Sequence, residues 1–412
     1  MQARIIFLIH TLAYLLLFLQ ADIEIRGRLA GLYLAQVLFL AAYLKLYPLS
    51  CKHISRVLLN NMCVMLSIGM VMLTRISMDK SEPLAMAFRQ FAWILLAALV
   101  TWPVPLIMNR AWQLSKIPWV YGITGLVLLL AVCIAGNTTY GARLSLDLFG
   151  ISVQPSEIVK IIFVFFAAAM FYRGTDKKTI AITTAAAAAH VLLLAGSRDL
   201  GGAFQFFITY LCMLFVATSR WLYMGLGLGG GMAAAVFSYK MFSHVQVRVE
   251  AWLNPWTDID KKGYQITQSL FAMGTGGWIG MGLYQGMPYK IPVVEKDFIF
   301  AAIVEELGGI FGVCLVLICL GCFLQMMMLA GKMQASFYKL IVFGLGMMYI
   351  VQVFLNIGGV IKFIPSTGVT LPLISYGGSS MLSTFLLFGV VQGLFMLKKN
   401  DEEDHGEETR IQ

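Results

Sequence analysis

Apolar stretches of about 20 residues recur along the whole chain, and they constrain the fold more than any other feature of the sequence. A stretch of this length can cross the ~30 Å hydrocarbon core of a bilayer as an α-helix. Charged residues make up only 12% of the 412 residues, about half of their share in a typical soluble domain. The sequence therefore predicts an all-α polytopic membrane protein without a separate soluble domain.

Hydropathy predicts about twelve transmembrane helices. Two lie within residues 1–50, and ten lie within residues 51–398. The chain then ends in an acidic tail, residues 399–412, which is too polar to pack and is predicted to be a disordered cytoplasmic end. The expected spans are centred within residues 4–20, 29–47, 57–74, 87–107, 118–135, 156–172, 179–196, 201–218, 221–241, 298–325, 338–357 and 374–396.

Lys and Arg concentrate in alternate loops and give the chain a net charge of +9. Such an excess marks the cytoplasmic loops of membrane proteins, so we expect both termini in the cytoplasm. Arg75, Lys80 and Arg89 fall on the opposite side and weaken this bias. No basic run is interleaved with aromatic residues, so the lipid bilayer rather than a nucleic acid is the expected surrounding.

The longest loop, residues 242–297, is expected on the extracytoplasmic face, before a helix that carries Asp297. It contains three tryptophans, which suit a membrane interface. Its stretch YQITQSLF has the apolar spacing of a short surface helix. A loop of this length is usually functional. A second outer stretch, residues 358–380, cannot form a continuous helix because it contains Pro365 and Pro372.

Ionisable residues near the outer ends of the predicted helices are candidate functional residues, because charge at membrane depth is costly. Glu157 and Lys160 are three residues apart at the start of a helix, so they can pair. A local ion pair without a further role explains them equally well.

On one straight helix Asp297 and Glu305 would be ~12 Å apart along the axis, so they do not form a carboxylate pair. Glu305 and Glu306 would lie deeper and hold neighbouring helices. The outer set is Arg143, Glu157, Lys160, Arg198, Asp199, Asp297 and Lys362.

Other motif matches in the sequence carry no chemistry. GLGLGG, residues 225–230, has the letters of a dinucleotide-binding pattern, but it lies within an apolar helix rather than between a strand and a helix. The five histidines show no metal-ligand spacing, and the seven cysteines fall in or beside apolar runs. We therefore expect no organic cofactor.

Four stretches of the sequence resemble the SEDS family of cell-wall proteins, which includes FtsW, RodA and SpoVE. Members of this family typically have ten spans, so the resemblance implies that residues 1–50 add two helices to a ten-helix core, residues 51–398. The stretches follow in the family's order across about residues 55–412. They are GAR at 141–143 with QPSEIVK at 154–160, DLGGA at 199–203, NPWTDIDKKGYQITQSLFAMGTGGWIGMGL at 254–283 leading to DFIFAAIVEELG at 297–308, and NIGGVIKFIPSTGVTLPLISYGGSSML at 356–382.

The resemblance implies a peptidoglycan glycosyltransferase that polymerises lipid II on the outer face of the bacterial cytoplasmic membrane. It also implies a class B penicillin-binding protein and other division or elongation proteins as partners. The family's catalytic aspartate maps onto Asp297, which would be the general base for the acceptor sugar's 4-hydroxyl. The residues expected to bind substrate are Arg143, Glu157, Lys160, Arg198, Asp199, Lys362, Ser375, Gly377 and Gly378.

The lipid diphosphate that departs in such a reaction needs positive charge. Arg143, Arg198, Lys160 or Lys362 would supply it, or a bound divalent cation such as Mg²⁺ or Mn²⁺ would do so. The sequence does not choose among these sources.

Two family motifs are altered in this chain. The usual LPExHTDF reads IPVVEKDF, with Val293, Glu295 and Lys296 at the changed positions, and GARRW reads GARLS, with Leu144 and Ser145. Two alternatives to a glycosyltransferase therefore stay open. One is an inactive scaffold for the partner transpeptidase, and the other is a flippase for lipid-linked precursors. A role in division, elongation or sporulation is equally open.

Overall fold

The computed structural model describes residues 2–411 except 140–141, 149–150, 260 and 262. Its described part contains twelve helices that are long and apolar enough to cross a membrane, which confirms the number predicted from hydropathy. These spans are formed by α1 (Gln2–Gln20), α2 (Ile23–Ser50), α3 (Arg56–Met78), α4 (Ala85–Thr101) continued by α5 (Val104–Ile107), α6 (Pro118–Ala135), α7 (Pro155–Arg173), α8 (Lys177–Gly196), α9 (Leu200–Thr218), α10 (Trp221–Met241), α14 (Gly309–Lys332), α15 (Ser336–Val360) and α16 (Gly378–Ile411).

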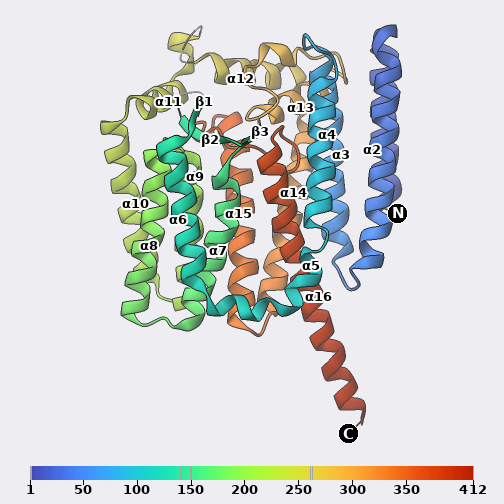
Figure 1. The fold of residues 1–412 in the computed structure, drawn as a ribbon. Coiled ribbons are helices and arrows are strands. Elements are labelled where there is room, and N and C mark those ends of the chain that lie inside the picture. Colours follow the sequence, from blue (N-terminus) through green and yellow to red (C-terminus); the bar gives the residue numbers. More distant parts are fainter. Residues whose placement is uncertain (1, 140–141, 149–150, 260, 262, 412) are drawn as a thin grey trace.

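The spans run side by side, with short helices and strands gathered at one end of the bundle and the C-terminus projecting from the other (Figure 1). The most buried spans are α3, α7, α15 and α16, whereas α1 and α10 are among the least buried. Small residues let the central helices approach closely. A Cβ at Gly344 of α15 would lie only 2.6 Å from Val164 of α7.

The end of the bundle opposite the C-terminus carries the long outer segment, residues 242–297 (Figure 1). It contains two α-helices, α11 over Ser243–Leu253 and α12 over Tyr264–Gly276. α12 begins at the stretch that was predicted to be a short helix. Two 3₁₀-helices follow α11 and α12, over Pro255–Asp258 and Pro288–Lys290.

The predicted continuous helix over residues 298–325 is wrong. The chain instead forms a short helix, α13 over Ile299–Leu307, and then the span α14. Gly308 separates them with a φ of +91°, which glycine adopts without strain. The first N–H of α14 donates to Gly277 O at 2.9 Å, so the outer segment supplies a hydrogen bond at the break.

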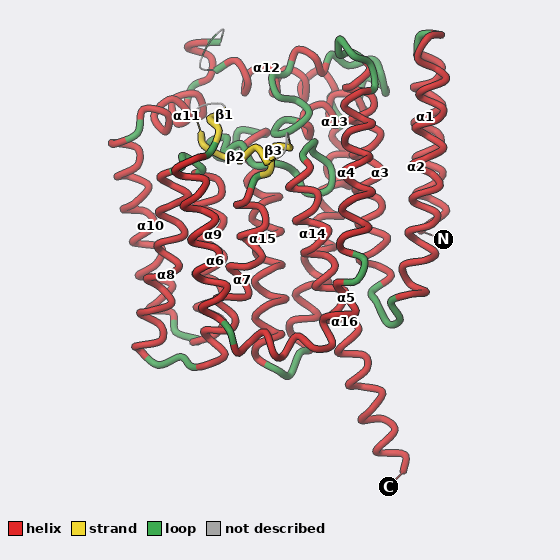
Figure 2. The backbone as a smooth tube through the Cα atoms, viewed as in Figure 1, coloured by secondary structure: helices red, strands yellow, loops and turns green. Residues whose placement is uncertain are grey.

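Three short strands lie between α6 and α7, close to the outer segment (Figure 2). They are β1 (Asn137–Thr139), β2 (Ala142–Leu148) and β3 (Ile151–Val153), and they form an antiparallel sheet in the order β1-β2-β3. We did not expect strands here. The signal exists in β2, where Leu alternates with other residues in the two-residue period of a strand.

Residues 361–377 contain no helix, as Pro365 and Pro372 predict, and α16 begins at Gly378 rather than near residue 374. α16 continues to Ile411, so the described backbone of the acidic tail is helical where disorder was expected. The tail contains no proline, and it follows a helix that is already formed, which removes the cost of nucleation.

The hairpin of α1 and α2 packs against α3 through polar groups as well as apolar ones. Tyr14 Oη donates to Gln36 Oε1 at 2.7 Å and lies 2.8 Å from Thr74 Oγ1. His10 Nδ1 lies 2.9 Å from Ser67 Oγ. All five side chains are at most 3% exposed. Because paired polar groups strengthen helix association inside an apolar bundle, residues 1–50 are joined to the core.

Arg75 of α3 lies at the centre of a buried charge network and is only 2% exposed. Its Nε donates to Glu306 Oε1 at 2.9 Å, and its Nη1 donates to Asp79 Oδ2 at 2.6 Å. Its Nη2 donates to Gly286 O at 3.2 Å. Glu305 Oε1 accepts a backbone N–H of the outer segment at 3.1 Å. The two glutamates thus hold α13 to its neighbours as predicted, and the pairing explains why Arg75 departs from the positive-inside pattern.

We predict that Arg75→Leu destabilises the protein by about 3–5 kcal/mol, because it leaves the Glu306 carboxylate buried without a compensating charge. Unfolding in mixed detergent micelles would measure the free energy. Arg89→Leu is the matched control, since Arg89 and Glu82 are 71% and 78% exposed and their closest atoms are 4.0 Å apart. Exposed pairs contribute at most about 1 kcal/mol. Equal losses for the two variants would contradict the assignment.

Candidate active site

The backbone of Asp297 is fixed by a polar side chain from a central span. Asp297 lies two residues before α13, at the outer end of the bundle. Asn356 of α15 donates through Nδ2 to Asp297 O at 2.9 Å and to Val369 O at 2.7 Å. Asn356 is 3% exposed. One buried amide therefore joins the segment that carries Asp297 to the irregular segment 361–377.

Ser375 and Tyr376 bind the two residues that precede Asp297. Ser375 Oγ donates to Lys296 O and accepts from the N–H of Leu371 at 2.9 Å. The N–H of Tyr376 donates to Glu295 O at 2.7 Å. Ser375, which was expected to bind substrate, therefore also positions the segment before Asp297. Glu295 and Lys296, which differ from the family pattern, make these contacts through backbone carbonyls that any residue could supply.

Gly377 and Gly378 also hold the segment in place. The N–H of Gly377 donates to Gln90 Oε1 at 3.1 Å. A Cβ at Gly378 would lie 2.4 Å from the ring of Trp93, so the start of α16 lies directly against α4. Both glycines were expected to bind substrate, and these contacts show that they also pack against α4.

Gly368 lies close to the Asp297 carboxylate and to the guanidinium of Arg248 on α11, a residue that we did not expect at the site. A Cβ at Gly368 would lie 3.6 Å from Asp297 Oδ2 and 3.9 Å from Arg248 Nη2. The φ of Gly368 is +74°, which favours glycine. The base candidate and a cation therefore flank one point that is kept free of side-chain atoms.

The environment of Asp297 shifts its protonation equilibrium. Burial raises the pKa of Asp297 to about 6, the charges of Lys296 and Arg248 oppose this rise in pKa, and the charge of Glu295 adds to it. Asp297 as a whole residue is of intermediate exposure. Asp297 is therefore a stronger base than an ordinary aspartate and is still largely ionised at neutral pH.

Asp199 extends this charge cluster towards α7. Its Oδ1 accepts from the N–H of Gly202 at 2.8 Å and so caps the start of α9. Burial raises the pKa of Asp199, the Gly202 bond opposes that rise, and Glu157 adds to it. Arg248 and Lys160 lower the pKa of Asp199. Arg248 thus acts electrostatically on both Asp297 and Asp199.

Glu157 and Lys160 pair as predicted, at 2.6 Å between Nζ and Oε2. The pair is not merely local, because it joins three helices. Lys160 Nζ also donates to Gln352 Oε1 of α15 at 2.8 Å, and Ser383 Oγ of α16 donates to Glu157 Oε2 at 2.7 Å. Gln352 Nε2 in turn donates to Thr370 O at 3.0 Å, which connects the pair to segment 361–377.

The remaining predicted residues lie at the rim of this region. Arg143 on β2 is exposed and donates through Nη1 to Cys133 O, at the end of α6, at 2.7 Å. Arg198 is exposed and has a φ of +64° in the turn before α9. Lys362 also has a positive φ, of +60°, and its carbonyl accepts from Trp252 Nε1 at 3.1 Å.

Sequence reasoning missed four residues of the site: Arg248, Gln352, Asn356 and Ser383. Gln352 and Asn356 are polar residues four apart in an apolar span, so they lie on one helix face, and this signal could have found them. Asn356 Oδ1 and Thr367 Oγ1 are buried and have no hydrogen-bond partner within the described part of the chain. They are therefore acceptors available to a hydroxyl-rich ligand or to water.

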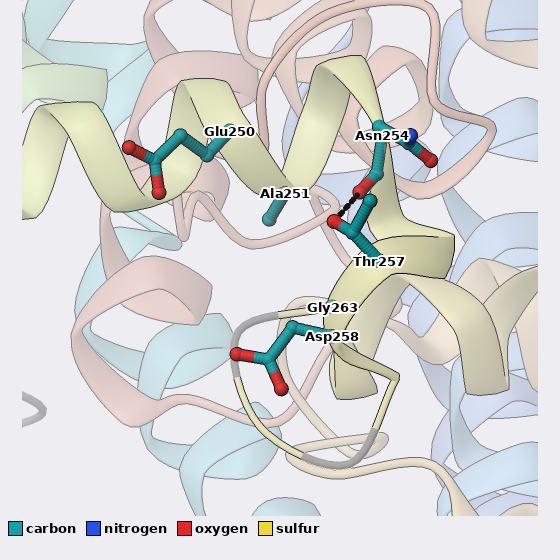
Figure 3. Close-up of a pocket in the computed structure, with 6 residues that line it drawn as sticks. All are labelled: Glu250, Ala251, Asn254, Thr257, Asp258 and Gly263. Atoms are coloured by element: carbon teal, nitrogen blue, oxygen red, sulfur yellow. Dashed lines mark hydrogen bonds between the residues drawn. The ribbon is translucent and has the colours of Figure 1, made fainter.

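A separate hollow of about 290 Å³ lies within the outer segment (Figure 3). It is lined by Glu250, Ala251, Asn254, Thr257, Asp258 and Gly263. Figure 3 shows the hydroxyl of Thr257 donating to Asn254 O at 2.9 Å, with the carboxylates of Glu250 and Asp258 apart from each other. None of these residues belongs to the cluster around Asp297. Among the described residues, no three His, Cys, Asp or Glu side chains come together as metal ligands.

The fold and the site define a polytopic helical membrane protein with a carboxylate and a guanidinium gathered where irregular segments meet at one end of the bundle. The sequence model of the FtsW, RodA and SpoVE family, described as "Cell cycle protein", matches residues 55–400. The chain therefore belongs to this family, as the resemblance of its motifs implies. α1 and α2 precede the matched region.

Related proteins agree with this assignment. "Peptidoglycan glycosyltransferase RodA" of Mycobacterium tuberculosis (strain ATCC 25618 / H37Rv) is 31% identical over 347 residues, covering 79% of this chain and 74% of that protein. "Probable peptidoglycan glycosyltransferase FtsW" of Aliivibrio salmonicida is 35% identical over 278 residues, covering 63% and 68%.

Two solved structures share the fold. A chain from "Structural coordination of polymerization and crosslinking by a peptidoglycan synthase complex" matches with a TM-score of 0.70 at 22% identity, covering 84% of this chain and 98% of that one. The rod shape determining protein RodA of Thermus thermophilus matches with a TM-score of 0.62 at 23% identity, covering 83% and 96%.

We predict that Gly368→Ala destabilises the protein by about 1–3 kcal/mol, because a Cβ is strained at this positive φ. Gly274→Ala is the control, since Gly274 is in α12 and a Cβ there meets nothing within 4 Å. That change should be neutral or stabilise by up to about 1 kcal/mol. Unfolding in mixed micelles would measure both. A Gly368→Ala protein as stable as the control would show that the local backbone geometry is different.

Proposed function

We propose that this protein polymerises lipid II into glycan strands at the outer face of the bacterial cytoplasmic membrane, with Asp297 as the general base. The chain is a peptidoglycan glycosyltransferase by family, since relatives 31–35% identical across most of their length carry that name. The observation that carries the mechanism is the placement of the Asp297 carboxylate. It lies near Arg248 in a residue of intermediate exposure, at the bundle end that bears the outer segment.

The reaction needs a base that is ionised at neutral pH. In the proposed step, the acceptor sugar's 4-hydroxyl oxygen bonds to the anomeric carbon of the lipid-linked donor. The hydroxyl proton passes to Asp297, and the bond from the anomeric carbon to the diphosphate breaks. A positioned base typically contributes 10²–10⁴-fold. The pKa of about 6 makes Asp297 basic enough to accept the proton and ionised enough to begin the reaction.

The buried polar residues around Asp297 would position it and the substrate. Asn356 fixes the Asp297 backbone, and the Glu157–Lys160 pair fixes α7 against α15 and α16. The free acceptor atoms of Asn356 and Thr367 could then receive hydrogen bonds from sugar hydroxyls. Such contacts favour a polyhydroxylated substrate over a purely apolar one.

The altered residues beside Asp297 are compatible with activity. Glu295 and Lys296 contact Tyr376 and Ser375 through backbone carbonyls, so the replaced side chains are not needed to place Asp297. An inactive scaffold would not require a carboxylate and a guanidinium to be kept close together beside a glycine. We therefore favour the enzyme over the scaffold.

Partner and orientation are part of the same proposal. A solved structure with this fold comes from a peptidoglycan synthase complex that coordinates polymerisation and crosslinking. By analogy, a class B penicillin-binding protein would act with this chain. An even number of spans places both termini on one side of the membrane, which would be the cytoplasm. The outer segment would then face the cell wall.

A divalent cation such as Mg²⁺ or Mn²⁺ would come with the substrate. The described residues provide single carboxylates near the site rather than a set of three ligands. Mg²⁺ is commonly bound by one or two carboxylates together with substrate phosphates. With Asp297 kept as the base, Asp199 is the carboxylate that would hold the cation, which would supply positive charge to the diphosphate.

We predict that Asp297→Asn abolishes polymerisation of labelled lipid II, lowering the rate at least about 100-fold, because the amide cannot accept the proton. The purified protein, with its candidate transpeptidase and Mg²⁺ or Mn²⁺, would be assayed by gel analysis of the glycan products. Asp258→Asn is the control, since Asp258 is another carboxylate of the outer segment but lines the separate hollow. Equal polymer from wild type and Asp297→Asn would remove Asp297 from the mechanism. No polymer from the wild type with several partners would favour the scaffold.

The pH dependence gives a second test. Because the base must be ionised, we predict that kcat/KM rises from pH 5 and levels off above a midpoint near pH 6. Lys296 lowers the pKa of Asp297 and Glu295 raises it. Lys296→Gln should therefore move the midpoint to higher pH, and Glu295→Gln should move it to lower pH. A midpoint that neither variant moves would mean that another group controls the rate.

A further inference from the structure

We propose that Arg248 of α11 binds the diphosphate of the lipid-linked donor, opposite Asp297. This inference rests on the proposed function and assigns a ligand, an organic diphosphate, to a residue that the sequence motifs did not indicate. Four other cations were expected to supply this charge: Arg143, Arg198, Lys160 and Lys362.

Two side-chain hydrogen bonds hold α11 against segment 361–377. Arg248 Nη1 donates to Ser366 O at 3.1 Å, and Trp252 Nε1 donates to Lys362 O at 3.1 Å. Arg248 and Trp252 are four residues apart, so they lie on the same face of the helix. The guanidinium is therefore held by one of its nitrogens, and the other terminal nitrogen points towards Gly368.

Arg248 and Asp297 are close without forming a direct ion pair. Both lie within 4 Å of the point where a Cβ of Gly368 would be. Among the described residues, no nitrogen of Arg248 lies within the 4.0 Å ion-pair limit of Asp297 or Asp199. A half-buried guanidinium with an unused edge is matched in geometry and charge to phosphate oxygens.

Of the four expected cations, Lys160 is fully engaged, and Arg143 is held by a backbone carbonyl as Arg248 is. Lys160 is 3% exposed and donates to both Glu157 and Gln352. Arg143 donates to Cys133 O at the end of α6. By contrast, the charge of Arg248 acts directly on Asp297, the group proposed to take the proton.

The presence of both groups within 4 Å of one point beside Gly368 suits a displacement at an anomeric carbon. The acceptor oxygen forms its bond to carbon while Asp297 takes the hydroxyl proton. The electron pair of the broken carbon–oxygen bond stays on the departing diphosphate, and Arg248 donates hydrogen bonds to its oxygens. The negative charge that develops therefore meets a fixed positive one.

Binding of farnesyl diphosphate to the full-length protein in detergent micelles tests the proposal without requiring turnover. Arg248→Gln should weaken this binding about tenfold or more, because hydrogen bonds to charged groups contribute about 1.5–3 kcal/mol. Arg248→Lys should bind farnesyl diphosphate with intermediate affinity, since it keeps the positive charge but cannot donate bidentate hydrogen bonds. Farnesyl monophosphate and inorganic pyrophosphate, measured alongside, show whether the diphosphate or the prenyl chain carries the affinity.

Trp252→Phe is the matched control, because it removes the second link between α11 and segment 361–377 without changing charge. If Trp252→Phe weakens diphosphate binding as much as Arg248→Gln does, Arg248 acts by holding α11 and the proposal is wrong. Unchanged binding in Arg248→Gln would also overturn it. Should Arg248→Gln fail to fold, the Arg248→Lys and Trp252→Phe proteins decide: only Arg248→Lys should bind more weakly than wild type.

Asp297→Asn separates this inference from the proposed function. It should lose polymerisation but still bind farnesyl diphosphate, since it keeps Arg248. In a polymerisation assay, Arg248→Lys should raise KM for the lipid-linked substrate. A wild-type protein that binds farnesyl diphosphate through Arg248 yet makes no polymer would refute the polymerase and leave the diphosphate site in place.

Discussion

A polar group inside an apolar bundle must find a partner, and this requirement determines which helices of the protein meet. Arg75 cannot be buried without Glu306, so α3 and α13 are held together. Lys160 binds Glu157 and Gln352, which joins α7 to α15. Tyr14 does the same for the N-terminal hairpin. Apolar packing contributes most of the contact area, but it is non-directional. The few paired polar groups give the bundle its specific arrangement.

The candidate site lies where regular helices stop. The segment before α13 and residues 361–377 have backbone groups that no helix satisfies, and such backbone is tolerated near membrane depth only when protein or a wet cavity covers it. Asn356 and Ser375 supply the missing partners. The same contacts that satisfy the backbone also fix Asp297. The hydrogen bonds that satisfy the irregular backbone therefore also place the reactive carboxylate.

The outer segment, residues 242–297, connects the candidate site around Asp297 to the extramembranous surface. α11 brings Arg248 to Asp297, and the loop after α12 closes around the C-terminal end of α13 through Glu305 and Glu306. The membrane-spanning helices provide rigid support, and the outer helices provide the charge opposite the base. A protein bound to the outer segment would therefore be able to influence the site through α11.

The sequence by itself determined the twelve spans, the pairing of Glu157 with Lys160 and the family. The thickness of the bilayer sets span length, and helical geometry sets which near neighbours meet, so both can be read locally. Family motifs also identified Asp297. The break at Gly308, the internal contacts of Ser375 and Gly378, and the approach of Arg248 to Asp297 were decided only by tertiary structure. These features join segments far apart in the chain, and their geometry depends on how all the helices pack, which no local pattern encodes.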